Sequence, residues 1–210
     1  MGADQSAFEI PLYPQPNPIC ATEARFCLPH YVQLRLREKF WSVSGDDFKI
    51  CDATDKTKIY FQCEGRSMSL SEKRFLFDNA GVPVLNMKMK IMSFTDVFRI
   101  FAGDSSERQI CSFKAKMNLL KAKISTLFPD AIKEGLYHHL VLKGDWRDKR
   151  CVIFLGEPKL GGTPIARIFR PYTGRTVLLG VDDYILEVAS GVDIAICVMM
   201  CIALDEHSRS

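Results

Sequence analysis

Six lysines have a spacing that could form a binding site for anions. In two apolar runs the lysines occupy every second position, and two more lysines follow shortly afterwards: Lys88, Lys90, Lys114, Lys116, Lys121 and Lys123. Alternation of this kind places side chains on the solvent face of a β-strand. Like charges on neighbouring strands cost stability, and a bound anion would relieve that cost. We therefore expect an anionic partner at these lysines, with a solvated face of screened charges as the alternative.

An anionic phospholipid headgroup is the ligand that fits this expectation. Tight hairpins would set Lys88 beside Phe98, Lys116 beside Lys121 and Lys114 beside Lys123, so that the lysines gather at one end of a sheet. The adjoining loops, 91–94 and 117–120, are apolar, as a rim touching a membrane would be. A basic residue near an anionic membrane contributes about 1 kcal/mol.

The N-terminus matches a lipidation pattern. Met1 and Gly2 are followed by Ser6, which gives the M-G-x-x-x-[ST] motif for myristoylation of Gly2. One acyl chain binds membranes only marginally, with a constant of about 10⁴ M⁻¹, so a second signal would be needed. The lysines or acylation of Cys20 could supply it, and a chance match of this short motif is the alternative.

Catalytic and metal-binding patterns are weak. His138 and His139 could activate Cys151, but Cys151 begins an apolar run, which is typical of a core thiol. Cys197 and Cys201 lie one helical turn apart without a further ligand, which favours core packing. There is no C-x-x-C pair, and the four histidines are not spaced with the cysteines as zinc ligands are. We expect no enzyme activity, no cofactor and no metal.

Composition limits the class of protein. Hydrophobic residues make up 47% of 210 residues, which is enough for a core, and a net charge of +3 is too weak to suggest nucleic acid. Several of the eight cysteines lie in apolar runs, and the polar start does not resemble a secretory signal. Reduced thiols in an intracellular, cytoplasmic protein, peripheral to a membrane, are therefore expected.

Strand patterns dominate the chain. Short runs of alternating apolar and polar residues, separated by turn-rich stretches, recur at roughly even spacing at 32–36, 48–50, 59–63, 75–77, 85–89, 98–100, 111–115, 122–128, 139–143, 149–155, 164–169 and 184–188. Such a pattern is typical of a mainly β sandwich or barrel with meander topology. We predict a closed antiparallel barrel of about twelve strands.

One helix is predicted at the end of the chain. Ser190 and Asp193 fit a capping box, and the apolar run Ile194–Leu204 has no polar face. A bilayer span needs about 17 to 25 residues, so the run must be buried in protein. A barrel of about twelve strands leaves room for it, whereas about eight are filled by side chains alone. A helix packed on one sheet face at an oligomer interface is the alternative to this enclosed helix in a monomer.

The chain resembles the LURP-one-related family of the Tubby-like fold. The similarity rests on the order and spacing of 75–85, 98–103, 142–146 and 191–206. The resemblance implies a twelve-stranded barrel around a C-terminal helix, related to the Tubby C-terminal domain and to phospholipid scramblases. Tubby domains bind phosphoinositides, and plant members are linked to pathogen defence. No catalytic motif is carried over by this resemblance.

A single domain over residues 26–206 follows, with a flexible, proline-containing leader over 1–25 and a tail over 207–210. Two functional hypotheses remain. The first is a non-enzymatic module that binds anionic phospholipid headgroups at a membrane surface, in defence or stress signalling. The second is an interaction domain for an unknown protein partner, with no small ligand.

Overall fold

The computed structural model describes residues 8–37, 48–66, 73–90, 96–118, 121–170 and 183–208. The described residues form twelve strands, two short 3-10 helices and one α-helix. These elements are η1 (Ala24–Phe26), β1 (Val32–Arg37), β2 (Phe48–Asp52), β3 (Ile59–Arg66), β4 (Lys73–Asp78), β5 (Pro83–Lys90), β6 (Asp96–Ala102), β7 (Gln109–Asn118), β8 (Lys121–Pro129), β9 (Tyr137–Asp145), β10 (Arg150–Leu155), η2 (Pro158–Leu160), β11 (Thr163–Phe169), β12 (Asp183–Val188) and α2 (Ile194–His207).

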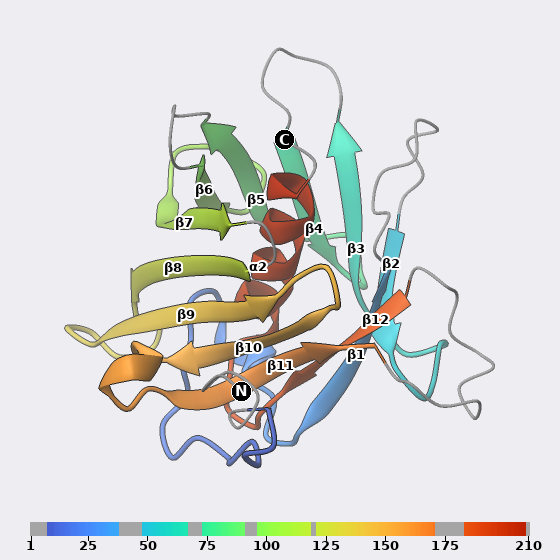
Figure 1. Cartoon of the computed structure of the whole chain (residues 1–210). Coiled ribbons are helices and arrows are strands. Elements are labelled where there is room, and N and C mark those ends of the chain that lie inside the picture. Colours follow the sequence, from blue (N-terminus) through green and yellow to red (C-terminus); the bar gives the residue numbers. More distant parts are fainter. Residues whose placement is uncertain are drawn as a thin grey trace.

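The twelve strands close into one barrel (Figure 1). Each strand pairs antiparallel with the next along the chain, and β1 pairs with β12 from Val32↔Val188 to Arg37↔Asp183, which closes the ring. Closure removes the exposed strand edges that an open sheet would leave. The predicted antiparallel barrel of about twelve strands is confirmed.

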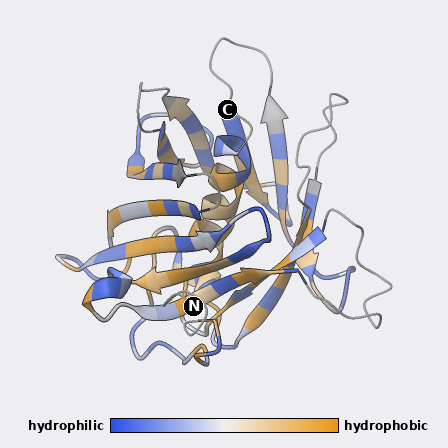
Figure 2. Ribbon diagram, viewed as in Figure 1, coloured by the Kyte–Doolittle hydropathy of each residue, from blue (hydrophilic) through white to orange (hydrophobic). Residues whose placement is uncertain are grey.

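Side chains alternate between the inside and the outside of the barrel. On β8, for example, Ala122, Ile124 and Phe128 are buried, whereas Lys121 and Leu127 are exposed. Figure 2 shows the same alternation as hydrophobic and hydrophilic colours along the strands. This period of two is what fixes the register of each strand, because a shift by one residue would bury the charged set.

Helix α2 lies within the ring of strands (Figure 1). All its residues from Ile194 to Asp205 are buried, and it contacts β5, β7, β8 and β12. Full burial of one large aliphatic side chain stabilises a fold by about 1.5–3 kcal/mol, so this helix supplies much of the core. The prediction of an enclosed helix is confirmed, in place of a helix docked on one sheet face.

The N-terminal end of α2 differs in detail from the prediction. The N-cap residue is Asp193, whose Oδ1 accepts from the amides of Ala195 (2.9 Å) and Ile196 (3.4 Å). The predicted capping residue, Ser190, precedes Gly191, and the φ of +81° at Gly191 makes a turn between Ser190 and the helix. Asp193 directly precedes the helix, so its carboxylate is better placed to cap the amides of the first turn.

Three ionisable residues fasten the C-terminal end of α2 to the barrel. Asp205 Oδ1 lies 3.2 Å from Lys149 Nζ, and Glu206 Oε1 lies 3.1 Å from Arg74 Nε. The third contact joins His207 to Asp96 on β6. Because His207 belongs to the helix, the ordered structure extends beyond residue 206, where the sequence predicted a tail.

The N-terminal strap, residues 15–27, closes the end of the barrel where α2 begins (Figure 1). The amide of Ile19 donates to Gly191 O, the amide of Asp193 donates to Ile19 O, and the side chains of Ile19 and Cys20 are buried. The sequence predicted a flexible leader over residues 1–25. Its prolines show no periodicity, so nothing in the pattern predicted bonds to the helix end.

Candidate functional site

Five of the six predicted lysines lie on the outer surface of the barrel, together with two further lysines and one arginine. We call the outward-facing residues Lys73, Lys88, Arg99, Lys114, Lys116, Lys121, Lys123 and Lys143 of strands β4 to β9 the basic face. On β4 to β6, Lys73 pairs with Lys88 and Lys88 pairs with Arg99. On β7 to β9, Lys116 pairs with Lys123 and Lys123 pairs with Lys143. Two rows of three cationic side chains thus cross the sheet.

The expected hairpin pairings were wrong, although the five lysines whose side chains are described face outward as predicted. Lys88 lies opposite Arg99 and not beside the buried Phe98. Lys116 lies opposite Lys123 and not Lys121, because β7 continues to Asn118 and leaves a shorter turn than expected. The β7–β8 change is two residues, an even shift that keeps the same faces outward.

Positive charges crowd one another on this surface. The pKa of Lys88 is lowered, first by partial desolvation, then by the charge of Lys73 and its hydrogen bond, and finally by Arg99. Like charges opposed across strands are destabilising. An anion placed over Lys73, Lys88 and Arg99 would remove this repulsion, which is the physical reason to regard the row as a candidate site.

Acidic residues lie near two lysines of β8. Lys123 Nζ lies 2.8 Å from Glu157 Oε2, and Lys121 lies opposite Asp145 in the β8–β9 register. Lys114 and Lys116 are exposed. The backbone of Lys90 lies on β5 opposite Val97, but its side chain is outside the described residues. Lys88, Lys114 and Lys116 are therefore the predicted residues best placed to meet an anion.

A surface groove of about 530 Å³ adjoins the second row on β7, β8 and β9. Its polar lining includes Lys114, Ser112, Ser125 and His139, and Ser125 Oγ lies 2.9 Å from His139 Nε2. Hydroxyl groups, an ammonium and an imidazole are all able to donate hydrogen bonds to a phosphate. The sequence did not single out Ser125, and it suggested His139 only as a catalytic partner of Cys151, because only the observed register brings β8 and β9 together at this point.

An apolar tip, formed by Leu127, Ile132 and Tyr137, stands at the β8–β9 hairpin. These side chains are 60%, 53% and 62% exposed. Lys123, Ser125 and Leu127 follow one another on the outer face of β8, at a spacing of roughly 6.6 Å for every second residue. Basic, polar and apolar groups therefore share one surface.

The apolar loops that were predicted as a membrane rim cannot be compared with this tip. Residues 91–95 and 119–120 lie outside the described residues, as do the side chains of Met117 and Asn118. Gly2, the predicted site of lipidation, also lies outside the described residues.

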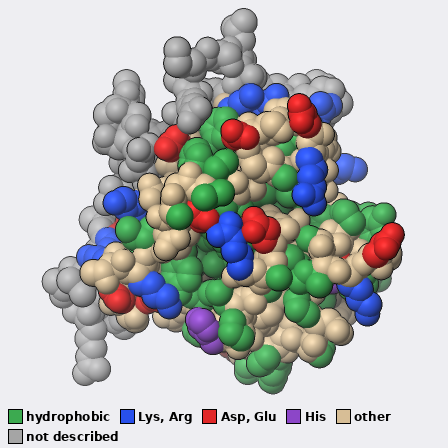
Figure 3. All heavy atoms as spheres, turned by 180° about the vertical axis from the view of Figure 1, so that it is seen from behind, with side chains coloured by type: hydrophobic (Ala, Val, Ile, Leu, Met, Phe, Trp, Pro, Cys, Tyr) green, Lys and Arg blue, Asp and Glu red, His purple; other side chains and the backbone are tan. Residues whose placement is uncertain are grey.

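The surface seen from behind, in the view opposite to that of Figure 1, carries charges of both signs. In Figure 3, basic and acidic side chains are interspersed and stand beside patches of hydrophobic side chains. Charges of opposite sign also meet at the N-terminal strap, where the guanidinium of Arg25 lies 2.8 Å from the carboxylate of Glu23 and 2.7 Å from that of Asp78. Interspersed charges of this kind produce a weaker local field than rows of one sign.

The residues considered for nucleophilic catalysis are not brought together. Cys151 is fully buried and pairs with Gly144, whereas His138 lies six residues earlier on β9, roughly 20 Å along the strand. His138 Nε2 instead lies 2.7 Å from Asp130 Oδ2.

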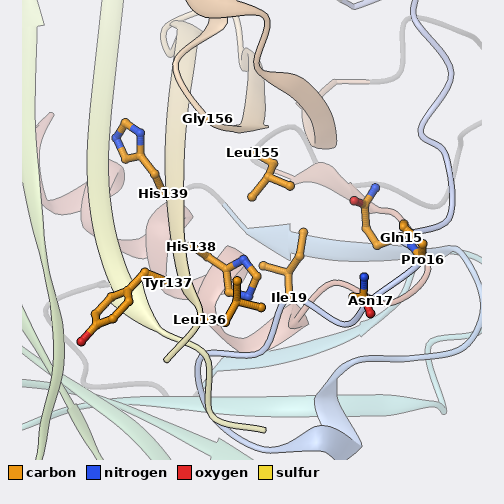
Figure 4. Close-up of a pocket in the computed structure, with 10 residues that line it drawn as sticks. All are labelled: Gln15, Pro16, Asn17, Ile19, Leu136, Tyr137, His138, His139, Leu155 and Gly156. Atoms are coloured by element: carbon orange, nitrogen blue, oxygen red, sulfur yellow. The ribbon is translucent and has the colours of Figure 1, made fainter. Parts of the chain in front are cut away.

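His138 lines a second cavity of about 430 Å³ between the N-terminal strap and the ends of β9 and β10. Figure 4 shows the side chains of Ile19, Leu136 and His138 close together, with those of Tyr137 and His139 pointing away. The lining is mostly apolar, and its one buried histidine is held by Asp130. This arrangement anchors the strap.

A comparison with known families decides what the barrel is. The model of the LURP-one-related family matches residues 32–205. The chain belongs to this family. The resemblance seen in the sequence motifs is thereby confirmed over the whole barrel and its helix.

Relatives in this family span most of the chain. Protein LURP-one-related 15 of Arabidopsis thaliana is 26% identical over 89% of this chain and 85% of its own length. Protein LURP1 of the same plant is 28% identical over 92% of each. An uncharacterized Bacillus subtilis protein, YxjI, is 25% identical over 83% of this chain and 92% of its own length. These names state no reaction and no ligand.

A solved structure supports the fold. The X-ray structure of a protein from Arabidopsis thaliana superposes with a TM-score of 0.64 at 18% identity, covering 90% of this chain and 98% of that one. At this identity the likeness concerns the fold alone. In the described part of the chain, no helix is long and apolar enough to cross a membrane.

Proposed function

We propose that this LURP-one-related domain is a non-enzymatic binding module that recognises anionic phospholipid headgroups, including phosphoinositides, through its basic face. The observation that carries the proposal is the cross-strand alignment Lys73–Lys88–Arg99 on β4 to β6. Three cations held side by side by backbone pairing are already placed for a ligand with several negative charges. A bound anion would reduce their mutual repulsion, which adds to desolvation in lowering the pKa of Lys88.

The surroundings of the second row, Lys116–Lys123–Lys143, support a membrane rather than a free anion. The groove beside Lys114 offers the hydroxyl groups of Ser112 and Ser125 to a phosphate. The apolar tip can enter the headgroup region, where amphipathic rings such as that of Tyr137 are favoured. Because Lys123 and Leu127 share the outer face of β8, one flat partner can touch charge and tip together.

Vesicle binding of a lysine variant tests the proposal. The variant Lys88→Ala, Lys90→Ala, Lys114→Ala, Lys116→Ala should bind anionic vesicles several kcal/mol more weakly than the wild type, at about 1 kcal/mol for each lysine. Co-sedimentation with phosphatidylcholine vesicles, with and without phosphoinositide, measures the loss. The fold should persist, because the side chains of Lys88, Lys114 and Lys116 point outward and removal of like charges costs little.

A matched pair of variants controls for total charge. One double variant carries Lys114→Ala and Lys116→Ala, and the control carries Lys49→Ala and Lys58→Ala, so both lose the same net charge. Lys49 and Lys58 belong to β2 and the β2–β3 turn, five strands from β7. Only the first pair should weaken binding. Equal losses in both pairs would indicate attraction by net charge alone and would contradict a specific face.

A protein partner is the second candidate for the same surface. The exposed Leu127, Ile132 and Tyr137 could also pack against an acidic partner that has an apolar patch. If the wild type does not bind anionic vesicles at low salt, binding of a protein partner replaces lipid recognition as the proposed function.

A further inference from the structure

Two thiols and one carboxylate converge where the N-terminal strap meets the start of α2. The sulfur atoms of Cys20 and Cys27 and an oxygen of Asp193 all lie within 4.8 Å of one another. Cys20 and Asp193 are buried, and Cys27 is partly exposed at the surface. Backbone bridges hold the cluster, because Ile19 pairs with Val192 and Cys27 pairs with Asp193. The strap and the helix start therefore fix all three side chains.

Carboxylates surround the cluster and make its environment negative. Asp193 is buried, and the groups that donate to its two oxygens are neutral: the amides of Ala21, Thr22, Ala195 and Ile196 and the hydroxyl of Thr22. A second buried carboxylate, that of Asp130, accepts from the amide of Cys20 at 3.2 Å. Burial of carboxylates is costly unless positive charge is near.

The thiols face the same negative environment. Cys27 Sγ donates to the carbonyl oxygen of Ile19 over 3.7 Å, and the carboxylate of Asp193 lies within 4.8 Å of both sulfur atoms. Such an environment attracts a cation, and a thiol that coordinates a metal ion loses its proton.

We propose that Cys20, Cys27 and Asp193 bind one thiophilic divalent metal ion of the zinc type. Two sulfur ligands and one oxygen ligand match the donor atoms that Zn²⁺ accepts, and a water molecule on the solvent side of Cys27 would complete four-coordination. Binding converts both thiols to thiolates and releases two protons to solvent. Rotation of the Thr22 hydroxyl away from Asp193 Oδ2, which it now approaches to 2.7 Å, frees an electron pair for the metal.

The metal would join two parts of the chain that are far apart in sequence. Cys20 and Cys27 lie on the strap, and Asp193 caps the helix at the centre of the barrel. A metal that binds the folded chain and not the unfolded chain raises the melting temperature in proportion to the logarithm of its concentration. We therefore expect Zn²⁺ to stabilise the whole barrel by holding its strap in place.

Titration of the purified full chain with Zn²⁺ and Co²⁺, under a metal-free phosphine reductant, tests this site. The wild type should bind one equivalent, show a thiolate-to-cobalt charge-transfer band, release two protons and melt at a higher temperature. Cys27→Ser should lose the band and bind Zn²⁺ more than about 100-fold more weakly. Such a loss would exceed the about 10–100-fold loss expected for a residue that only hydrogen-bonds to a metal ligand.

Cys51→Ser is the matched control, because it also removes one thiol from the chain but lies on β2, outside the cluster. It should bind metal as the wild type does. Circular dichroism checks that both variants are folded. Because Cys27 is partly exposed, its replacement by serine should disturb the fold little. The proposal fails if the reduced wild type binds no metal, or if Cys27→Ser retains the cobalt band.

Discussion

At the scale of single residues, buried carboxylates organise the end of the barrel that the strap closes. Asp130 Oδ1 accepts from the amides of Ile132 (2.8 Å) and Lys133 (2.6 Å). Asp130 Oδ2 accepts from the amide of Cys20 and from His138. Burial is the largest single influence and raises the pKa of Asp130, but the hydrogen bonds from Lys133, His138, Ile132 and Cys20 together lower it more, so the net pKa lies below its ordinary value.

This shift predicts a pH dependence of stability. A carboxyl group whose pKa is lower in the folded state stabilises the fold above its unfolded pKa of about 3.9, and that contribution is lost as the pH falls through the folded pKa. Asp130→Asn should cost about 1–3 kcal/mol at neutral pH, because buried donors lose their acceptor. Urea unfolding at pH 7 and at pH 3 measures both effects. The loss should shrink at pH 3, and an equal loss at both pH values would contradict the account.

Individual residues also show what the sequence could not provide. The outward facing of Lys88 and Lys114 follows from simple alternation, so it was predictable. The cluster of Cys20, Cys27 and Asp193 was not, since Asp193 is 166 residues from Cys27 and six residues separate the two cysteines. Only the closure of the barrel brings the strap to the helix start.

At the scale of elements, helix α2 is the clearest case in which pattern and structure agree. A helix without a polar face must be enclosed, and its burial from Ile194 to Asp205 follows directly. Its cap was mistaken because Ser190 and Asp193 are both good capping residues, and the choice between them depends on the turn at Gly191. The hairpin registers were mistaken for a similar reason, because turn length sets register and the pattern does not specify turn length.

A charge placed inside the helix tests its enclosure. Ile196→Asp should destabilise the protein by about 4 kcal/mol or more, since Ile196 is fully buried and the new carboxylate would have no partner. Ile132→Asp is the matched control, because Ile132 is 53% exposed at the apolar tip. Thermal unfolding followed by circular dichroism compares the two variants. A small effect at Ile196 would show that the helix is accessible to solvent.

At the scale of the whole molecule, the barrel and its helix are mutually dependent. The twelve strands enclose α2, and the side chains of α2 form the middle of the core. Both ends of the helix are fastened, by Asp193 to the strap and by Asp205 and Glu206 to the barrel wall. A chain that ends at Ser190 should therefore fail to fold. A cooperative melt of that truncated chain would contradict the central-helix arrangement.

The proposed function depends on the outer surface of the barrel. Wild-type binding to vesicles as a function of salt concentration tests this function most directly. At low ionic strength the protein should sediment with phosphatidylcholine vesicles that contain phosphoinositide and remain in solution with phosphatidylcholine alone. Binding should rise with the fraction of anionic lipid and weaken steadily with added salt, because exposed charges are screened beyond roughly 10 Å at 0.1 M. Failure to bind anionic vesicles at low salt, or binding that salt leaves unchanged, would contradict recognition of lipid headgroups by the basic face.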